Sequence, residues 1–473
     1  MTCSHVVLKM GSRLAFGVEG LDKLFSDVMR PPATIVVAGN PGTGKTTLAS
    51  TICYYNALNG HKCLYVSLQE DREKLFSNMK NLGIDFESLE RNGLVKFVKF
   101  PLYSDVSEIA NEINNSISAE NFSIIVIDSI NPLLQAVESD YAKRAWLQNY
   151  FYNLAKLVSG VVVLVAELPF GRKRVELGAI EFVVDAMIIL RHSIERGLVS
   201  RSVEVRKARE APLHIAEMPF SIQQGKGITV YIPPVLEEIA REGREIEIPC
   251  KEMKSRMGAL SHLHRSMVIY VAYPPDARPL NYIPLFFGVA VLNKMKVHVI
   301  SYLYPPELIR LLIHRSFDEL IDKERFERLA SNLIRIHSLN PFTYSLSELL
   351  HKELTIISED DDIVAFHGID VLWAVMRSRG EYLQNLYNQL NYLKDRQKLV
   401  IRMGSIISEE MYRVNAAISD LVMRFELEHK DGGAEYKVYI WRRGLEKPFV
   451  LRESELARCI AEIAEKVVQA DVQ

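Results

Sequence analysis

Short runs of Val and Ile alternate with longer stretches of helical character in the first half of the chain. The runs are Thr34–Ala38, Cys63–Ser67, Ser123–Ile127 and Val161–Ala166. Runs that are apolar at every position are typical of parallel strands covered by helices on both faces. The pattern therefore predicts a three-layer α/β module with a mainly parallel sheet. Two later runs, Ser202–Lys207 and Ile228–Ile232, are expected to add antiparallel strands.

The second half of the chain repeats this pattern. Val268–Asn281 aligns with Thr34–Thr47, Val297–Tyr304 with Cys63–Glu70, and Asp362–Val375 with Ser123–Val137. The order and the approximate spacing agree in both halves, as expected for two copies of one module. We expect a first domain over residues 1–240, a linker over residues 241–263 and a second domain over residues 264–473.

Bulk properties agree with a two-domain globular protein. The chain has 473 residues, 48% of them hydrophobic and 25% charged, and its formal net charge is −2, so no global basic field favours nucleic acid. The five cysteines show no Cys-x-x-Cys spacing, which favours reduced thiols over a zinc site. The most apolar run, Val161–Ala166, is too short to span a bilayer. We expect a soluble, cytoplasmic protein without a membrane partner.

A complete phosphate-binding motif follows the first strand. Gly39–Thr46 reads GNPGTGKT, which matches G-x-x-x-x-G-K-[ST] between a predicted strand and a predicted helix. Glycines allow consecutive backbone N–H groups to surround phosphate oxygens, and the helix N-terminus adds a favourable dipole. The motif predicts ATP as ligand, with Lys45 on its β- and γ-phosphates and the Thr46 hydroxyl on Mg²⁺. The expected binding residues are Gly39, Asn40, Pro41, Gly42, Thr43, Gly44, Lys45, Thr46, Thr47 and Asp128.

Acidic residues end two neighbouring strands. Asp128 closes the run SIIVID, which is where a second Mg²⁺ ligand belongs. The alternative is an aspartate that only caps the strand. Glu70, after CLYVSLQ, is the candidate for activating water, and Gln69 beside it could orient the water without accepting its proton. The alternative for Glu70 is a solvated loop acid.

Charge that develops on a γ-phosphate also needs cations. Lys207 and Arg209 lie at the end of the run VEVRKARE, and they are candidates for this role. A basic strand end can equally be a solvated edge.

Together these motifs resemble the KaiC-like branch of the RecA-fold ATPases. Phe16–Phe25 (FGVEGLDKLF) resembles the family's opening before the P-loop, and GNPGTGKTT, YVSLQED, IIVIDSI and VEVRKARE follow in family order. The resemblance is specific through the first module and much weaker beyond it. It implies a homo-oligomeric ring, a hexamer, with ATP bound between subunits.

The resemblance also assigns roles to four residues. It implies that Gln69 and Glu70 stand where the family has paired glutamates that activate water. It further implies that Lys207 and Arg209 reach the neighbouring subunit's γ-phosphate. Two departures stand out: Gln69 replaces the first glutamate, which suggests slow turnover, and Glu210 replaces the usual Gly, so that it could pair with Arg209 and weaken it.

The second module has lost the chemical groups of the first. Where the first module has Gly39, Gly42, Gly44, Lys45 and Thr46, the alignment places Tyr273, Asp276, Arg278, Pro279 and Leu280. Tyr304 replaces Glu70 and His367 replaces Asp128. Pro279 has no N–H to donate, and Asp276 would repel phosphate. We therefore expect no ordinary nucleotide site and no self-phosphorylation there, and we expect a scaffold or a surface for an unknown protein partner.

Three functions stay open on the sequence. The favoured one is a regulatory or signalling ring ATPase; the others are a DNA recombination or repair ATPase, and a nucleotide-binding switch with negligible turnover. Near-neutral charge disfavours DNA, whereas the basic cluster Arg172–Arg174, after the fourth core strand, favours it.

Overall fold

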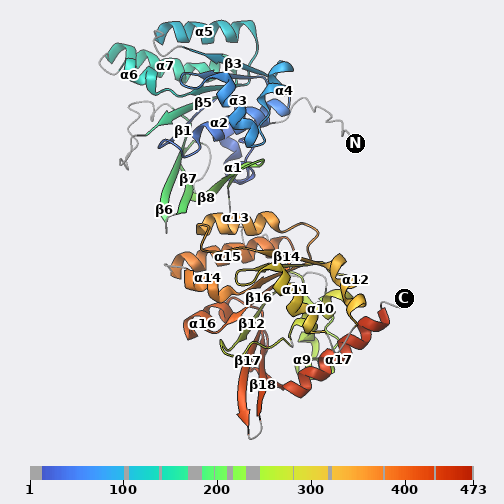
Figure 1. The fold of residues 1–473 in the computed structure, drawn as a ribbon. Coiled ribbons are helices and arrows are strands. Elements are labelled where there is room, and N and C mark those ends of the chain that lie inside the picture. The colour runs from blue at the N-terminus through green and yellow to red at the C-terminus, as the bar shows by residue number, and fades with distance from the viewer. Residues whose placement is uncertain are drawn as a thin grey trace. The chain divides into compact units, whose positions relative to one another are not determined.

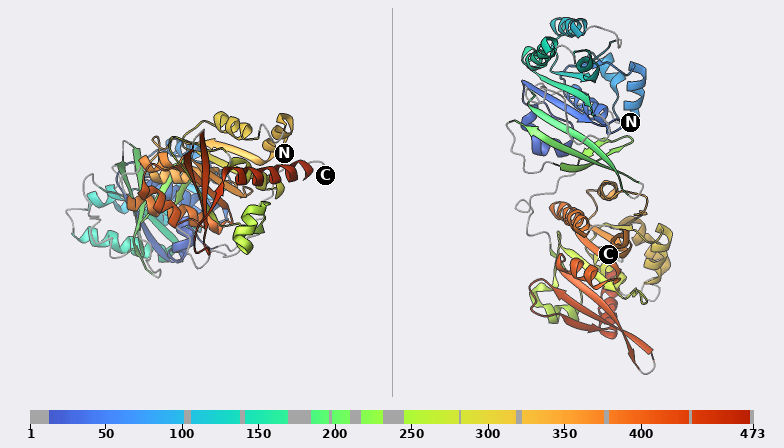
Figure 2. Two further views of the ribbon diagram at one scale, coloured as in Figure 1. Left: turned by 90° about the horizontal axis from the view of Figure 1, so that it is seen from below. Right: turned by 90° about the vertical axis from the view of Figure 1, so that its left-hand side faces the viewer.

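The computed structural model describes most of the chain. The described residues are 13–100, 106–137, 141–168, 184–195, 198–209, 217–230, 245–280, 282–317, 322–375, 379–430 and 433–470. They form two compact units, residues 1–232 and residues 233–473, each of which has its own sheet (Figures 1 and 2).

The first unit is a sheet covered by helices on both faces (Figure 1). Its strands are β1 (Ala33–Gly39), β2 (Cys63–Ser67), β3 (Val95–Lys99), β4 (Ile124–Asp128), β5 (Val161–Glu167), β6 (Ala186–Glu195), β7 (Leu198–Ala208), β8 (Glu217–Gln223) and β9 (Gly227–Val230). Its helices are α1 (Glu19–Phe25), η1 (Ser26–Met29), α2 (Lys45–Leu58), α3 (Arg72–Asn81), α4 (Phe86–Arg91), α5 (Val106–Ala119), α6 (Asn131–Ala136) and α7 (Tyr141–Val158).

The strand order of the first unit is β3-β2-β4-β5-β1-β6-β7-β8-β9, and the strands from β3 to β6 are parallel. Alternate side chains of the central strands enter two separate cores. One core holds Ile35 and Val37 with helices α1 to α4, and the other holds Val36 and Ala38 with helices α5 to α7. The four predicted core strands are confirmed to within one residue, and β7 and β9 pair with their neighbours in antiparallel fashion.

The second unit has the same arrangement. Its strands are β10 (Glu245–Ile246), β11 (Leu263–His264), β12 (Val268–Tyr273), β13 (Val297–Ser301), β14 (Ile334–Ser338), β15 (Ile363–His367), β16 (Leu399–Ser405), β17 (Leu421–Lys430), β18 (Gly433–Arg442) and β19 (Phe449–Arg452). Its helices are α9 (Lys251–Met257), η3 (Gly258–Ser261), α10 (Tyr282–Leu292), α11 (Pro306–Arg315), α12 (Lys323–Leu333), α13 (Leu346–Ile356), α14 (Ile369–Val375), α15 (Arg379–Asp395), α16 (Glu409–Ala417) and α17 (Glu453–Ala470).

The internal repeat predicted from the sequence is present in the sheet topology. The order β14-β13-β15-β16-β12-β17-β18 of the second unit matches β3-β2-β4-β5-β1-β6-β7 of the first, strand for strand. Helices again cover both faces: α10 and α11 lie on one and α14 and α15 on the other (Figure 1). The fold is therefore α/β with two RecA-like modules.

The structure differs from the sequence prediction in the segment expected to be a linker. Ile246, Ile248, Met253 and Met257 are buried in the core of the second unit. The sequence hid this because the apolar residues are sparse and are spread over a short strand and a short helix, so no periodicity developed. Residues 245–263 are thus part of the second unit.

The expectation of reduced thiols is wrong for one pair. Cys250, at the start of α9, forms a disulfide with Cys459 on α17, with Cα atoms 4.7 Å apart. A separation of 209 residues in the chain gave no local signal for this pairing. Cys53 and Cys63 are buried free thiols. None of the described helices is both long enough and apolar enough to cross a bilayer.

Candidate functional site

The glycine-rich loop of the first unit connects β1 to α2. Gly42 and Gly44 have φ angles of +78° and +101°, which favour glycine. A Cβ at Gly44 would lie 2.5 Å from Cδ1 of Ile222, and one at Gly39 would lie 2.5 Å from the carbonyl oxygen of Leu190. Larger residues therefore do not fit at Gly39 and Gly44.

Side chains within the loop hold it in shape. The Thr43 hydroxyl donates a 2.8 Å hydrogen bond to the carbonyl oxygen of Asn40, and the Lys45 ammonium donates a 3.0 Å bond to the same oxygen. The Asn40 amide in turn donates to the carbonyl of Leu168, just after β5. Burial lowers the pKa of Lys45, and the carboxylates of Glu167 and Asp128 oppose this effect. A phosphate oxygen would add the opposite charge that this buried ammonium favours.

Asp128 lies at the tip of β4 beside the loop. Burial raises the pKa of its carboxyl group, whereas hydrogen bonds from the Thr46 hydroxyl and the Tyr65 phenol lower it. The Tyr65 bond measures 2.9 Å. Asp128 and Thr46 thus present oxygen atoms to the same point, and hard oxygen ligands of this kind suit Mg²⁺. These residues fit the metal that the motif implies.

Glu70 and Gln69 follow β2, the strand next to β4. Ser67 fixes this turn, because its hydroxyl accepts from the N–H of Glu70 and donates to the carbonyl of the same residue. The Gln69 amide donates a 3.1 Å bond to the hydroxyl of Ser129, whereas Glu70 lies 3.5 Å from the ammonium of Lys74. Glu70 is half-buried and Gln69 is exposed.

One cavity joins these groups. It is lined by Pro41, Gly42, Gly44, Lys45, Thr46, Thr47, Gln69, Glu70 and Asp128, together with Tyr65 and Glu167. Sequence reasoning missed the last two. Glu167 ends the apolar run of β5 as Asp128 ends that of β4, so an acid at a strand tip was an available signal. Tyr65 lies inside β2, where a buried tyrosine is not distinguishable from core.

Lys207 and Arg209 lie away from the loop end of the sheet. Lys207 on β7 pairs with Met187 on β6, and Met187 pairs with Val36 in the middle of β1. Gly39, in contrast, is at the loop end of β1. The three residues from Val36 to Gly39 correspond to about 10 Å along the strand. Arg209 pairs with Asp185 at 3.4 Å. The two cations are therefore not part of the cavity beside their own loop.

Two sequence-based hypotheses concern residues outside the described part of the chain. The pairing of Glu210 with Arg209 and the basic cluster Arg172–Arg174 both lie outside the described residues.

In the second unit the corresponding positions carry different side chains. Tyr273 ends β12 and is buried, Pro279 is buried, and Tyr304 stands where the first unit has Glu70. His367 ends β15 as Asp128 ends β4; its Nδ1 lies 3.1 Å from the Ser301 hydroxyl. Burial, aided by the charge of Arg278, lowers the pKa of His367 to about 4. His367 is thus a neutral, hydrogen-bonded residue near neutral pH.

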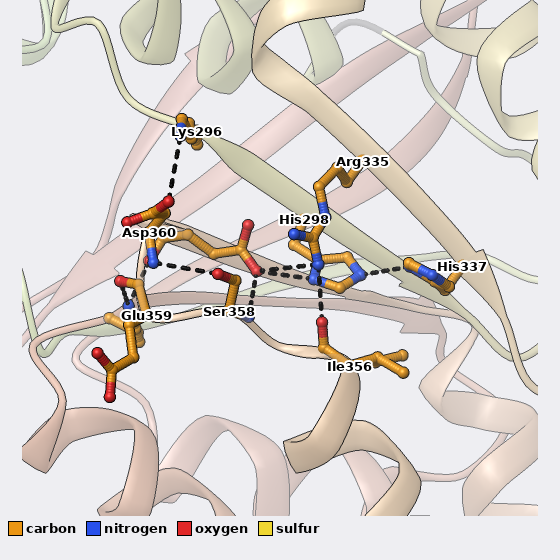
Figure 3. Close-up of polar contacts among 10 residues, drawn as sticks. Lys296, His298, Arg335, His337, Ile356, Ser358, Glu359 and Asp360 are labelled. Atoms are coloured by element: carbon orange, nitrogen blue, oxygen red, sulfur yellow. Dashed lines mark hydrogen bonds and ion pairs between the residues drawn. The ribbon is translucent and has the colours of Figure 1, made fainter. Parts of the chain in front are cut away.

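A histidine–aspartate cluster in the second unit had no sequence signal. His298 Nδ1 lies 2.9 Å from Asp361 Oδ2, and His298 Nε2 lies 2.7 Å from Nδ1 of His337 (Figure 3). His298 and Asp361 are almost completely buried, whereas His337 is exposed. Because His298 donates to the carboxylate, its Nε2 accepts from His337. Within the described residues no nucleophile or metal ligand completes the cluster, and we regard it as structural.

Comparison with known proteins agrees with this geometry. Residues 14–235 match the family model described as the KaiC ATPase. The first unit is a KaiC-like RecA-fold module. Curated relatives include the circadian clock oscillator protein KaiC of Picosynechococcus sp., 28% identical over 199 residues, and that of Rippkaea orientalis, 27% identical over 199 residues. That of Thermosynechococcus vestitus is 26% identical over 198 residues.

These matches cover part of each protein. They extend over 42% of this chain and over 39%, 38% and 38% of the three relatives, respectively. The chain therefore matches about two fifths of the length of these KaiC proteins. The KaiC-like assignment therefore concerns the first unit alone.

Proposed function

We propose that this chain hydrolyses ATP in its first unit, at a site completed by a second copy of the chain. The observation that carries the proposal is the single cavity shared by the glycine-rich loop, Lys45, Thr46, Asp128 and Glu70. A loop built for phosphate, two oxygen ligands and a nearby carboxylate are the parts that phosphoryl transfer to water requires.

Each group has a defined task in this proposal. Backbone N–H groups of residues 42–46 and the Lys45 ammonium bind the β- and γ-phosphates. Thr46 and Asp128 hold Mg²⁺, which neutralises charge on these phosphates when it is bound. Glu70 accepts the proton of the attacking water, and Gln69 orients that water. Since Gln69 cannot accept a proton, a single carboxylate serves as the base, and we expect slow turnover.

Lys207 and Arg209 supply the missing cations in trans. They lie away from their own loop along the sheet, so they act on a γ-phosphate only if a neighbouring copy presents one. Burial lowers the pKa of Lys207, as does the charge of Arg209, and Asp185 opposes both. The two cations are thus close together, which suits a multiply charged anion. We propose a homo-oligomeric ring, a hexamer, in which nucleotide is bound between subunits and regulates assembly.

Mixing two inactive variants tests the shared site. Lys45→Ala removes the phosphate ligand, and the double variant Lys207→Ala/Arg209→Ala removes the proposed trans cations. Each alone should lose at least about 100-fold in turnover. A mixture should regain activity, because some interfaces pair an intact loop with intact cations. If the mixture stays inactive while both variants assemble with wild-type protein, the trans assignment is wrong.

Assembly itself is measured separately. Light scattering coupled to size exclusion, with and without ATP and Mg²⁺, should show a larger assembly when nucleotide is present. A chain that stays monomeric under both conditions contradicts the intersubunit site. A chain that assembles and binds ATP but shows no phosphate release supports a nucleotide-binding switch instead.

A further inference from the structure

The second unit contains a cavity of about 270 Å³ between its sheet and the helices α10 and α11. Its walls are almost entirely apolar, and they include Val299, Ala365, Phe287 and Leu312. This volume is nearly twice the ~150 Å³ of an apolar cavity that accommodates benzene. Apolar volume left empty in a core costs stability, so a cavity of this size indicates a ligand site.

The cavity occupies the position of the nucleotide site in the first unit. Under the repeat alignment, the wall residues Leu75, Asn78 and Met79 of α3 correspond to Ile309, Leu312 and Ile313 of α11, and each set lines the cavity of its own unit. Asp128 and His367, which end equivalent strands, also line the two cavities. The second unit has thus kept the place of a ligand site while its polar groups became apolar.

The loss of an aromatic ring contributes to the extension of the second cavity beneath the helices. Tyr65 in the first unit packs against Phe86 and Phe97, with ring centroids 5.9 and 6.0 Å away. The equivalent residue of the second unit is Val299, which lines the cavity. The smaller side chain leaves volume open where the first unit is filled by an aromatic ring.

The mouth of the cavity carries one fixed positive charge. Arg278 is exposed; its guanidinium donates a hydrogen bond to the Tyr304 hydroxyl and lies 5.7 Å from the centre of that ring. His367 is neutral near pH 7, as described above. In the part of the chain that the structure describes, Arg278 forms no ion pair; burial raises the pKa of nearby Asp370, and the charge of Arg278 only partly opposes this effect. A guanidinium in this setting suits a carboxylate, which it can bind through two hydrogen bonds.

We propose that this cavity binds a medium-chain fatty acid, with the aliphatic chain inside and the carboxylate on Arg278. The walls offer aliphatic and aromatic contacts and no charge along the chain. Pro279 and Leu280, in place of Lys45 and Thr46, remove the phosphate and metal ligands that a nucleotide would need. The volume is near the lower limit for small-ligand pockets, which favours a short single chain over a larger lipid.

Isothermal titration of the full-length chain with decanoate, below its micelle concentration, tests the proposal. We expect saturable binding of one decanoate per chain, weaker binding of decanol and no binding of butyrate. Arg278→Gln should weaken decanoate binding about tenfold while leaving decanol unchanged. Val299→Tyr, which restores the residue of the first unit, should abolish binding of both.

Neighbouring residues of α11 supply a matched control for changes in packing. Leu312→Phe fills the cavity, whereas Leu311→Phe adds the same ring at an exposed position. We expect loss of decanoate binding in the first and wild-type binding in the second, with unchanged ATP binding in both. The proposal is overturned if wild-type protein binds no decanoate, if Leu312→Phe and Val299→Tyr bind it normally, or if decanol binds as tightly as decanoate.

Discussion

The Tyr65 phenol donates a 2.9 Å hydrogen bond to Oδ2 of Asp128, across the adjacent strands β2 and β4. Tyr65 is buried and Asp128 lines the proposed nucleotide cavity, so the bond joins the aromatic core to the proposed metal ligand. A carboxylate that is held in this way keeps its orientation before any metal binds.

We predict that Tyr65→Phe weakens Mg²⁺ binding, so that ATP turnover needs a higher Mg²⁺ concentration. The change removes one of the two hydrogen bonds that lower the pKa of Asp128. We expect a shift of about tenfold in the Mg²⁺ concentration needed for half-maximal turnover, as for other partners of metal ligands. Tyr54→Phe is the control, because Tyr54 packs against Phe86 in the same aromatic cluster. Equal shifts in both variants would contradict a specific effect on Asp128.

The second prediction concerns the base. Glu70→Gln should lower kcat by about 100-fold or more, because the amide cannot accept the proton of the attacking water. The affinity for ATP should change little, since Glu70 is not a phosphate ligand in the proposed site. Phosphate release and nucleotide binding are measured on the same preparation.

Glu167→Gln is the matched control for the base. Glu167 lines the same cavity, but its charge acts on Lys45. We expect it to alter ATP affinity more than kcat. If Glu70→Gln hydrolyses ATP at the wild-type rate, Glu70 is not the base. If Glu167→Gln alone loses ATP hydrolysis, Glu167 is the base.

The third prediction concerns the number of nucleotide sites. Wild-type protein should bind one ATP per chain, and Lys45→Ala should remove all measurable binding. The reason is that Arg278, Pro279 and Leu280 replace the last glycine, the lysine and the threonine of the loop. Equilibrium titration with a fluorescent ATP analogue gives the stoichiometry. Binding that persists in Lys45→Ala would show a nucleotide site in the second unit.

Much of this arrangement could be predicted from the sequence, for physical reasons. The central strands β1, β4 and β5 of the first unit are almost entirely apolar because helices cover both faces, and this pattern indicates a buried parallel sheet. The loop Gly39–Thr46 was also predictable, since glycine at positive φ and lysine at a helix start both favour phosphate binding.

Other features depend on distant parts of the chain. The disulfide between Cys250 and Cys459, and the bond between His298 and Asp361, join residues that only the folded chain brings together. The cavity of the second unit was missed for a different reason. A change from Tyr65 to Val299 looks like an ordinary core replacement in sequence, and only packing shows that no side chain of the described residues takes the place of the aromatic ring.

The fourth prediction concerns the buried pair His298–Asp361; Figure 3 labels His298 of this pair. Asp361→Asn should reduce the free energy of unfolding of the second unit by about 2 kcal/mol, because a buried imidazole loses its charged acceptor. Asp360→Asn is the control: the neighbouring carboxylate is mostly exposed and pairs with Lys296 at 3.5 Å. An exposed pair of this kind contributes less than about 1 kcal/mol. Equal losses in the two variants would contradict the special role of Asp361.

The last prediction concerns pH and His367. Its pKa is about 4 in the folded chain against 6.5 when exposed, so the unfolded chain binds the proton more tightly. A lowered pKa contributes stability that is fully present above pH 6.5 and is lost as the pH falls toward 4. Between pH 7 and pH 5 the second unit should lose on the order of 2 kcal/mol through this residue alone. His367→Gln does not titrate and should lack this component.

Urea unfolding of a Trp146→Phe background measures the effect in the second unit. Trp146 is the one tryptophan of the first unit, so the fluorescence of Trp373 and Trp441 then reports on the second unit. Other titrating groups are common to the two proteins and cancel in the comparison. A steeper loss of stability toward pH 5 in the protein with His367 than in His367→Gln is the expected result. Parallel curves would mean that His367 is not buried as a neutral residue.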